Sequence, residues 1–162
     1  MEHLAEELGY AGFALSVIHL PYLSAFTQPE WNNAETLPAA LDSVLSANDE
    51  RSSQEACHRL LYAVGNDHAG AYHSVALGIL PTLGQILRIS GPWPQRTVLE
   101  VLIELYGPFQ PEPGHQTFHG EPLQQLVRSA ISDLLPLVDT LRNSEPDIAR
   151  SANELLTLIN EA

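Results

Sequence analysis

The sequence predicts an all-α protein built from stacked pairs of antiparallel helices, and three observations lead to this prediction. From Glu35 onward, apolar residues recur at steps of three and four, which is the period of an amphipathic helix. Clusters of Gly, Pro, Ser and Asn separate these apolar runs, as expected at the ends of helices. The chain has 162 residues, the size of one domain, so we expect residues 1–162 to fold as a single unit.

Residues 1–34 fit the helical period of the rest poorly, and we predict that they form an N-terminal cap. The stretch MEHLAEEL is typical of a short helix, and FALSVIHLPYLSAF is apolar enough to cover the open end of a helical stack. Glutamates precede this apolar stretch where a signal peptide needs positive charge, so no export signal is expected. No apolar run approaches the roughly 20 residues of a membrane-spanning helix, which predicts a soluble protein.

Six helices are expected between residues 35 and 162. The apolar residues that define them lie within Leu37–Leu45, Cys57–Val64, Val75–Leu87, Val98–Leu105, Leu123–Val138 and Ile148–Ile159. The breaks between them include GNDHAG, SGPWPQ, GPFQPEPGHQTFHGEP and NSEP. These breaks are rich in residues that favour turns and helix caps, which is why we place the helix ends there.

The helices also form an internal repeat. When the segment beginning ILPTLGQ is aligned with the one beginning LLPLVDT, Pro81 coincides with Pro136 and, after a one-residue gap, Arg96 coincides with Arg150. A fainter third copy begins near Pro38. Units of two amphipathic helices stack side by side because neither helix can bury its apolar face alone.

This repeated pair of helices resembles the HEAT and armadillo class of α-helical repeat proteins, over about residues 35–162. The resemblance rests on the length of the paired helices, on a proline within each first helix, and on an arginine near the start of the second helix in the last two units. It implies an α-solenoid of about three repeats whose first helices are bent at proline. An irregular helical bundle is the structural alternative.

Charge is the strongest global feature of the sequence. Seven basic residues, all of them arginine, stand against 20 acidic residues and give a net charge of −13. Such a surface repels nucleic acid and anionic membrane, and it favours a cationic partner. The alternative is that the charge only keeps the protein soluble. The single cysteine, Cys57, excludes an intramolecular disulfide and is consistent with a cytoplasmic location.

The stretch AVGNDHAGAYHS, residues 63–74, is interpreted as the joint between two helical units. Gly65 suits a left-handed residue that ends a helix, and Asp67 and Ser74 could accept backbone N–H bonds at the start of the next. His68 and His73 are five residues apart and would lie on different faces of a helix, which disfavours a zinc site. The segment could still bind a partner, as loops at one edge of repeat proteins do.

The second unusual segment, residues 107–122, is longer than a joint between repeats requires. Its prolines are expected to keep it extended, while Phe109 and Phe118 offer aromatic contacts of the kind found at interfaces. His115 and His119 have the spacing of metal ligands, but Gln-Thr-Phe between them and the flanking glycines argue against a helix. A simple packed or disordered loop and a partner-binding loop remain alternatives.

Catalytic motifs are absent from the sequence. Arg96, Glu100 and Glu104 lie four apart, and we interpret them as a solvated helix face rather than as an acid–base pair. Cys57 falls on an apolar helical stripe, where a free thiol is usually inert packing. The sequence has no G-x-S-x-G motif, no phosphate-binding glycine loop and no lysine to complete one. We therefore predict no enzyme activity, no catalytic residue, no metal and no cofactor.

Two classes of function remain. The first is a non-catalytic binding protein, and the second, less favoured, is a metalloenzyme that uses some of His68, His73, His115 and His119. The resemblance narrows the first class, because small acidic bacterial proteins with HEAT-like helices often serve as immunity proteins that neutralise a toxin with a cationic active site. A scaffold or adaptor in a larger assembly is the competing binding role.

Seven residues are predicted to contact this protein partner. Acidic groups would steer a cationic partner, while buried aromatic anchors would set the residence time. The steering groups are Asp67, Glu100, Glu104 and Glu112, and the anchors are Tyr72, Phe109 and Phe118.

Overall fold

The computed structural model describes residues 23–161, and this part of the chain is mostly helical, which confirms the all-α class. Most of the predicted N-terminal cap falls in residues 1–22 and lies outside the described residues. None of the described helices is long and apolar enough to cross a membrane. The helices are α3 (Thr36–Leu45), α4 (Glu50–Val64), α5 (Val75–Ile89), α6 (Pro92–Tyr106), α7 (Leu123–Ser132), α8 (Leu135–Thr140), the short 3-10 helix η1 (Leu141–Asn143) and α9 (Pro146–Glu161).

Local sequence signals set the ends of the helices. The side chain of Asp49 accepts a hydrogen bond from the backbone N–H of Ser52, and the Ser52 hydroxyl accepts one from the N–H of Asp49, so that α4 begins with a reciprocal capping box. Helix α6 begins directly after Gly91 with Pro92, whose missing N–H costs nothing in the first turn. These signals explain why the predicted helix positions agree with the structure for α3 to α6.

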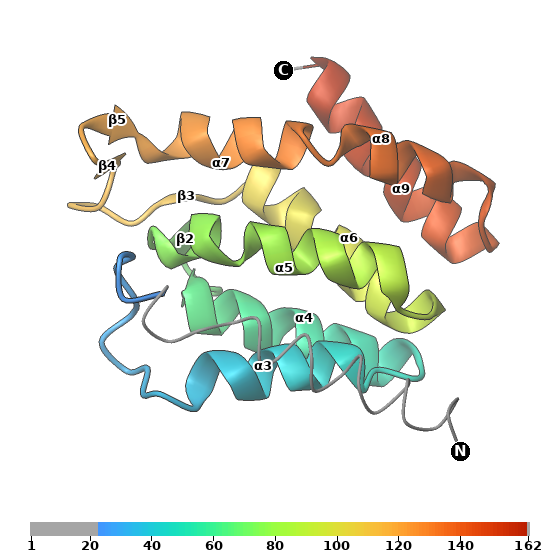
Figure 1. Cartoon of the computed structure of the whole chain (residues 1–162), viewed down its shortest axis with the longest axis horizontal. Coiled ribbons are helices and arrows are strands. Elements are labelled where there is room, and N and C mark those ends of the chain that lie inside the picture. The colour runs from blue at the N-terminus through green and yellow to red at the C-terminus, as the bar shows by residue number, and fades with distance from the viewer. Residues whose placement is uncertain (1–22, 162) are drawn as a thin grey trace.

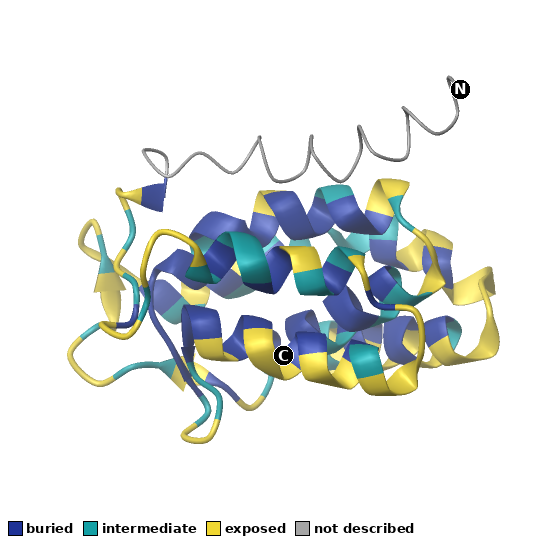
Figure 2. Cartoon of the chain, turned by 90° about the horizontal axis from the view of Figure 1, so that it is seen from below, coloured by how far each residue is buried: buried dark blue, intermediate teal, exposed yellow. Residues whose placement is uncertain are grey.

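Neighbouring helices pack along one another around a continuous apolar core (Figure 1). Helix α4 packs against both α3 and α6, and α6 packs in turn against α9 and α5. The connections at residues 46–49 and 90–91 are short, and packed helices joined by so few residues run antiparallel. Buried residues lie on the helix faces that are turned toward each other, as Figure 2 shows. Helix α6 therefore lies at the centre of the fold.

Within residues 23–161, five two-residue strands gather at one end of the helices, on the left of Figure 1. The strand β1 (Gly65–Asn66) pairs antiparallel with β2 (Ala71–Tyr72), which also pairs in parallel with β3 (Gln110–Pro111). A separate hairpin joins β4 (Thr117–Phe118) to β5 (Glu121–Pro122). The two segments singled out in the sequence, 63–74 and 107–122, therefore lie side by side. We call residues 71–73 and 110–122, which include β2 to β5, the strand end.

The conformation of Gly65 differs from the sequence prediction. Its φ of 179° is extended, and not left-handed as expected at a helix end. Glycine is needed there for a different reason, because a Cβ on Gly65 would lie 2.0 Å from the carbonyl oxygen of Ala71 on the paired strand. The left-handed residue of this hairpin is Gly70, with φ of 66°.

The prediction of one continuous helix over residues 123–138 is wrong. The chain forms two helices there, because α7 ends at Ser132 and α8 begins at Leu135, with Pro136 in its first turn. Pro38 likewise lies in the first turn of α3, where proline is tolerated without a bend, while Pro81 lies inside α5. The aligned prolines thus occupy different positions in their helices, and the expected bend applies only to α5.

Candidate functional site

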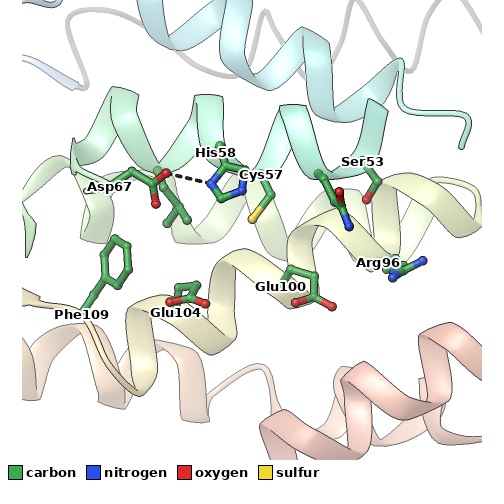
Figure 3. Close-up of a pocket in the computed structure, with 10 residues that line it drawn as sticks. Ser53, Cys57, His58, Asp67, Arg96, Glu100, Glu104 and Phe109 are labelled. Carbon is green, nitrogen blue, oxygen red and sulfur yellow. Dashed lines mark hydrogen bonds and ion pairs between the residues drawn. The ribbon is translucent and has the colours of Figure 1, made fainter. Parts of the chain in front are cut away.

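A groove of about 510 Å³ opens between α4 and α6 (Figure 3). Both helices turn polar side chains into it, together with one residue from the β1–β2 hairpin and one that follows α6. We call it the acidic groove; its lining residues are Ser53, Gln54, Cys57, His58, Leu61, Asp67, Arg96, Glu100, Glu104 and Phe109.

The α4 wall carries the thiol of Cys57 and the imidazole of His58, which are consecutive in the sequence. The His58 Nδ1 atom lies 2.7 Å from the Oδ2 atom of Asp67, which links the helix to the β1–β2 hairpin. Cys57 is buried, and burial raises the pKa of its thiol to about 12, an effect that the nearby Glu100 and Glu104 reinforce. The thiol is therefore protonated and a poor nucleophile at neutral pH, in agreement with its interpretation as inert packing.

The α6 wall carries Arg96, Glu100 and Glu104, which follow one another at helical steps of four. Arg96 is engaged at one end of the groove, where its guanidinium forms ion pairs with Glu50 at 3.5 Å and with Asp147 at 3.8 Å. These three residues are half-buried in the groove, so the interpretation as a solvated helix face is wrong. The error has a physical cause, because α4 and α9 pack on both sides of α6 and leave its polar stripe facing a gap between helices.

The two glutamates of α6 face different neighbours. Glu100 accepts a hydrogen bond of 3.0 Å from the hydroxyl of Ser151 on α9. Among residues 23–161, no arginine forms an ion pair with either Glu100 or Glu104. The arginines that form ion pairs in this part of the chain do so with other acidic residues. Within the described residues, both carboxylates therefore face the groove without a paired arginine.

The pKa of the Glu104 carboxyl is raised. Burial is the largest cause, and the negative charges of Asp67 and Glu100 add to it, while His58 acts in the opposite direction. A carboxylate that is both desolvated and surrounded by like charges is energetically unfavourable in the free protein. Carboxyl groups with a pKa perturbed in this way cluster at functional sites.

Phe109 closes the end of the groove opposite Arg96 (Figure 3). Its ring is only 6% exposed, so it contributes an apolar wall beside Glu104 and Asp67 and does not project as a free anchor. A cationic side chain with an aliphatic stem fits this combination, because the stem can contact the apolar wall while the charged end meets the carboxylates.

The structure brings together four of the seven predicted contact residues, namely Asp67, Glu100, Glu104 and Phe109. The other three, Tyr72, Glu112 and Phe118, belong to the strand end.

The two aromatic residues of the strand end serve the fold. Tyr72 is fully buried, and burial raises the pKa of its hydroxyl to about 12. Phe118 stacks on Phe26 with ring centroids 5.1 Å apart. Neither is placed as an exposed anchor.

The histidines considered as metal ligands lie in three different settings. His73 contacts His115 with ring centroids 4.6 Å apart, His68 contacts Tyr62, and His119 contacts Phe118. Within residues 23–161, no group of three or more His, Cys, Asp or Glu side chains is arranged to hold a metal ion.

His58 and Ser53 were missed in the sequence. Ser53, Cys57 and Leu61 are spaced at steps of four and share one face of α4, so a count of helix faces places them together. That this face adjoins the acidic stripe of α6 depends on how the two helices pack. No signal within α4 alone reports it.

Comparisons with known proteins leave the function open. The chain matches no family model, and no match was found among curated proteins or solved structures.

Proposed function

We propose that the chain is a non-catalytic binding protein whose acidic groove receives a cationic side chain of a protein partner. The observation that carries this proposal is the group of Asp67, Glu100 and Glu104 around one groove, with the pKa of Glu104 raised by burial and by the other two carboxylates. Like charges crowded in a half-buried site destabilise the free protein, and a bound cation would relieve that repulsion.

Arginine is the side chain that fits the groove best. Its planar guanidinium can donate to two carboxylates at once, and its stem can lie against Phe109. The net charge of −13 supplies a long-range field that accelerates encounter with a cationic surface. A partner whose own function requires exposed basic residues, such as an enzyme acting on nucleic acid or nucleotides, presents this chemistry.

The finer form of the proposal is an immunity protein with a HEAT-like arrangement of helices. The succession of packed helices α4, α6 and α9 supports the repeat interpretation, because second helices of consecutive units pack on one another in such proteins. An acidic inhibitor of this kind would cover the cationic active site of a toxin and take one of its basic side chains into the groove.

The groove is tested with a minimal probe, N-acetyl-arginine amide, titrated into the 15N-labelled protein. We expect shifts of backbone amides in α4 and α6, and E100Q/E104Q should weaken binding on the order of tenfold, because two of the three carboxylates are lost. The control is E121Q/E161Q, which removes the same charge at two exposed positions outside the groove. Equal loss in both double variants would contradict the proposal, because only net charge would then matter.

The immunity role is tested by growth. Co-expression with the product of a neighbouring toxin gene should permit growth with the wild-type chain and prevent it with E100Q/E104Q. For the purified pair, raising salt from about 50 to 500 mM shortens the screening length from roughly 14 Å to 4 Å, so the association rate should fall several-fold. Association that is indifferent to both salt and the double variant would exclude this role.

A further inference from the structure

An exposed aromatic cluster lies at the carboxyl end of α4. Trp31 is 47% exposed and Tyr62 is 41% exposed, and among residues 23–161 the only other large apolar side chain with comparable exposure is Ile89. The ring centroids of Trp31 and Tyr62 are 5.4 Å apart, and the exposed His68 packs edge-on against Tyr62 at 5.8 Å. We call these three residues the aromatic platform.

The platform is held in place by hydrogen bonds and is not a set of free side chains. The indole Nε1 of Trp31 donates to the carbonyl oxygen of Tyr62 at 3.0 Å, and the side-chain amide of Asn32 donates to the carbonyl oxygen of Ala63 at 2.6 Å. Both carbonyls belong to the last turn of α4, which otherwise leaves such groups without partners. The Trp31 ring is therefore fixed against the end of α4 before any ligand binds, which lowers the entropy lost on binding.

The platform is continuous with the acidic groove. Tyr62 lies one helical turn after His58 on α4, and His68 directly follows Asp67 in the β1–β2 hairpin. The contact between His58 and Asp67, at 2.7 Å, bridges these two elements at the boundary between groove and platform. A short extended segment can therefore contact both surfaces at once.

We propose that the aromatic platform stacks a second arginine of the segment whose first arginine occupies the acidic groove. The inference rests on the proposed function of the groove and names the chemistry of the partner, a protein segment with two closely spaced arginines. Aromatic faces attract cations, and the planar guanidinium also stacks on them. The negative end of the α4 dipole and the adjacent Asp67 favour a cation at the same place.

The same chemistry already operates within this chain. The guanidinium of Arg96 lies 5.2 Å from the ring centroid of Trp93, and that of Arg128 lies 5.4 Å from the ring of Tyr106. In both cases the ring receives an arginine from its own chain. Trp31 and Tyr62 take part in no such contact among the described residues, and their exposed faces are available to an arginine from a partner.

The probe for this inference is the peptide acetyl-Arg-Gly-Arg-amide, compared with N-acetyl-arginine amide by NMR titration. The chain has two tryptophans, so the indole N–H signal of Trp31 can be assigned as the one missing in W31A. We expect the peptide to shift this signal. Y62A and W31A should each weaken peptide binding by between about twofold and thirtyfold, the range of a cation–π contact. The single-arginine probe should bind these variants like the wild type.

Y62A is the decisive variant, because Trp31 also satisfies a carbonyl of α4 and its loss disturbs that helix end. The control I89A removes an exposed apolar side chain elsewhere and should leave binding unchanged. If the peptide binds Y62A and the wild type equally while E100Q/E104Q weakens peptide binding, the proposed role of the platform is contradicted and the proposed role of the groove is supported. If E100Q/E104Q also has no effect, the proposed function fails as well. Equal binding of acetyl-Lys-Gly-Lys-amide would overturn the preference for arginine.

Discussion

The acidic groove and the strand end use their polar and aromatic side chains in opposite ways. In the groove, Glu100 and Glu104 are positioned near other acids without an ion pair to an arginine of the described chain. At the strand end, Tyr72 is enclosed in the core and Phe118 is stacked on Phe26. The first region holds carboxylates that have no paired arginine among the described residues, whereas the two aromatic side chains of the second region have apolar contacts within the fold.

This difference is the reason why we propose a binding role for the groove acids and a structural role for Tyr72 and Phe118. Aromatic side chains on an unusual loop indicate an interface when they are exposed, but they stabilise the protein when they are buried. Half-buried acids of like charge do the reverse, because they reduce stability and are retained where they have another role.

The largest effect is expected for Y72A. Tyr72 has no exposed surface, so removal of its ring leaves a cavity and should reduce the free energy of unfolding by about 3–5 kcal/mol. Its hydroxyl has no hydrogen-bond partner within the described residues, so Y72F should be neutral or slightly stabilising. Urea unfolding of both variants measures this. If Y72A is as stable as the wild type, Tyr72 does not stabilise the fold and its structural role is contradicted.

A smaller effect concerns the pH dependence of stability at His73. Burial lowers the pKa of this imidazole, the nearby His115 lowers it further, and Glu112 acts in the opposite direction. The unfolded chain, with a histidine pKa of about 6.5, then binds more protons than the folded chain. The stabilisation due to neutral His73 is present above that pH and is lost as the pH falls below it.

Thermal unfolding between pH 7.5 and 5 measures the effect of His73. The midpoint of the wild type should fall more steeply than that of H73Q, which cannot titrate at this position. H119Q is the matched control, because it makes the same substitution at an exposed histidine of the strand end. Parallel profiles for the wild type and H73Q would contradict the expectation.

The smallest effect, with the opposite sign, is expected for E104Q. Glu100 and Glu104 are like charges four residues apart on α6, an arrangement that destabilises a helix by about 0.2–0.5 kcal/mol. The pKa of Glu104 is raised in the folded state, so ionisation of this carboxyl as the pH rises reduces the stability of the folded protein. E104Q should therefore be slightly more stable than the wild type at pH 7, while it binds the arginine probe less well. A destabilised E104Q would mean that the carboxylate serves the fold.

Particular residues show how far the sequence could be interpreted. The periodicity and caps of α3 to α6 can be recognised locally, and the acidic character of Asp67, Glu100 and Glu104 predicts them as contact residues for a cationic partner. The pairing of Gly65 with Tyr72, and of Tyr72 with Pro111, could not be recognised, because each strand has only two residues and is defined by partners distant in sequence. The break between α7 and α8 was missed because Pro136 is equally compatible with a bent helix and with the first turn of a new one.

By itself, the sequence determined that this chain is mostly helical, acidic and without an intramolecular disulfide, because helical period, charge and cysteine content are properties of the residues and their near neighbours. Only the tertiary structure decided which polar residues share a site. The stripe of Arg96, Glu100 and Glu104 would face solvent on an isolated helix. It lines a groove because α4 brings Cys57 and His58 opposite it and the β1–β2 hairpin adds Asp67, and this placement follows from packing of the whole core rather than from any local pattern.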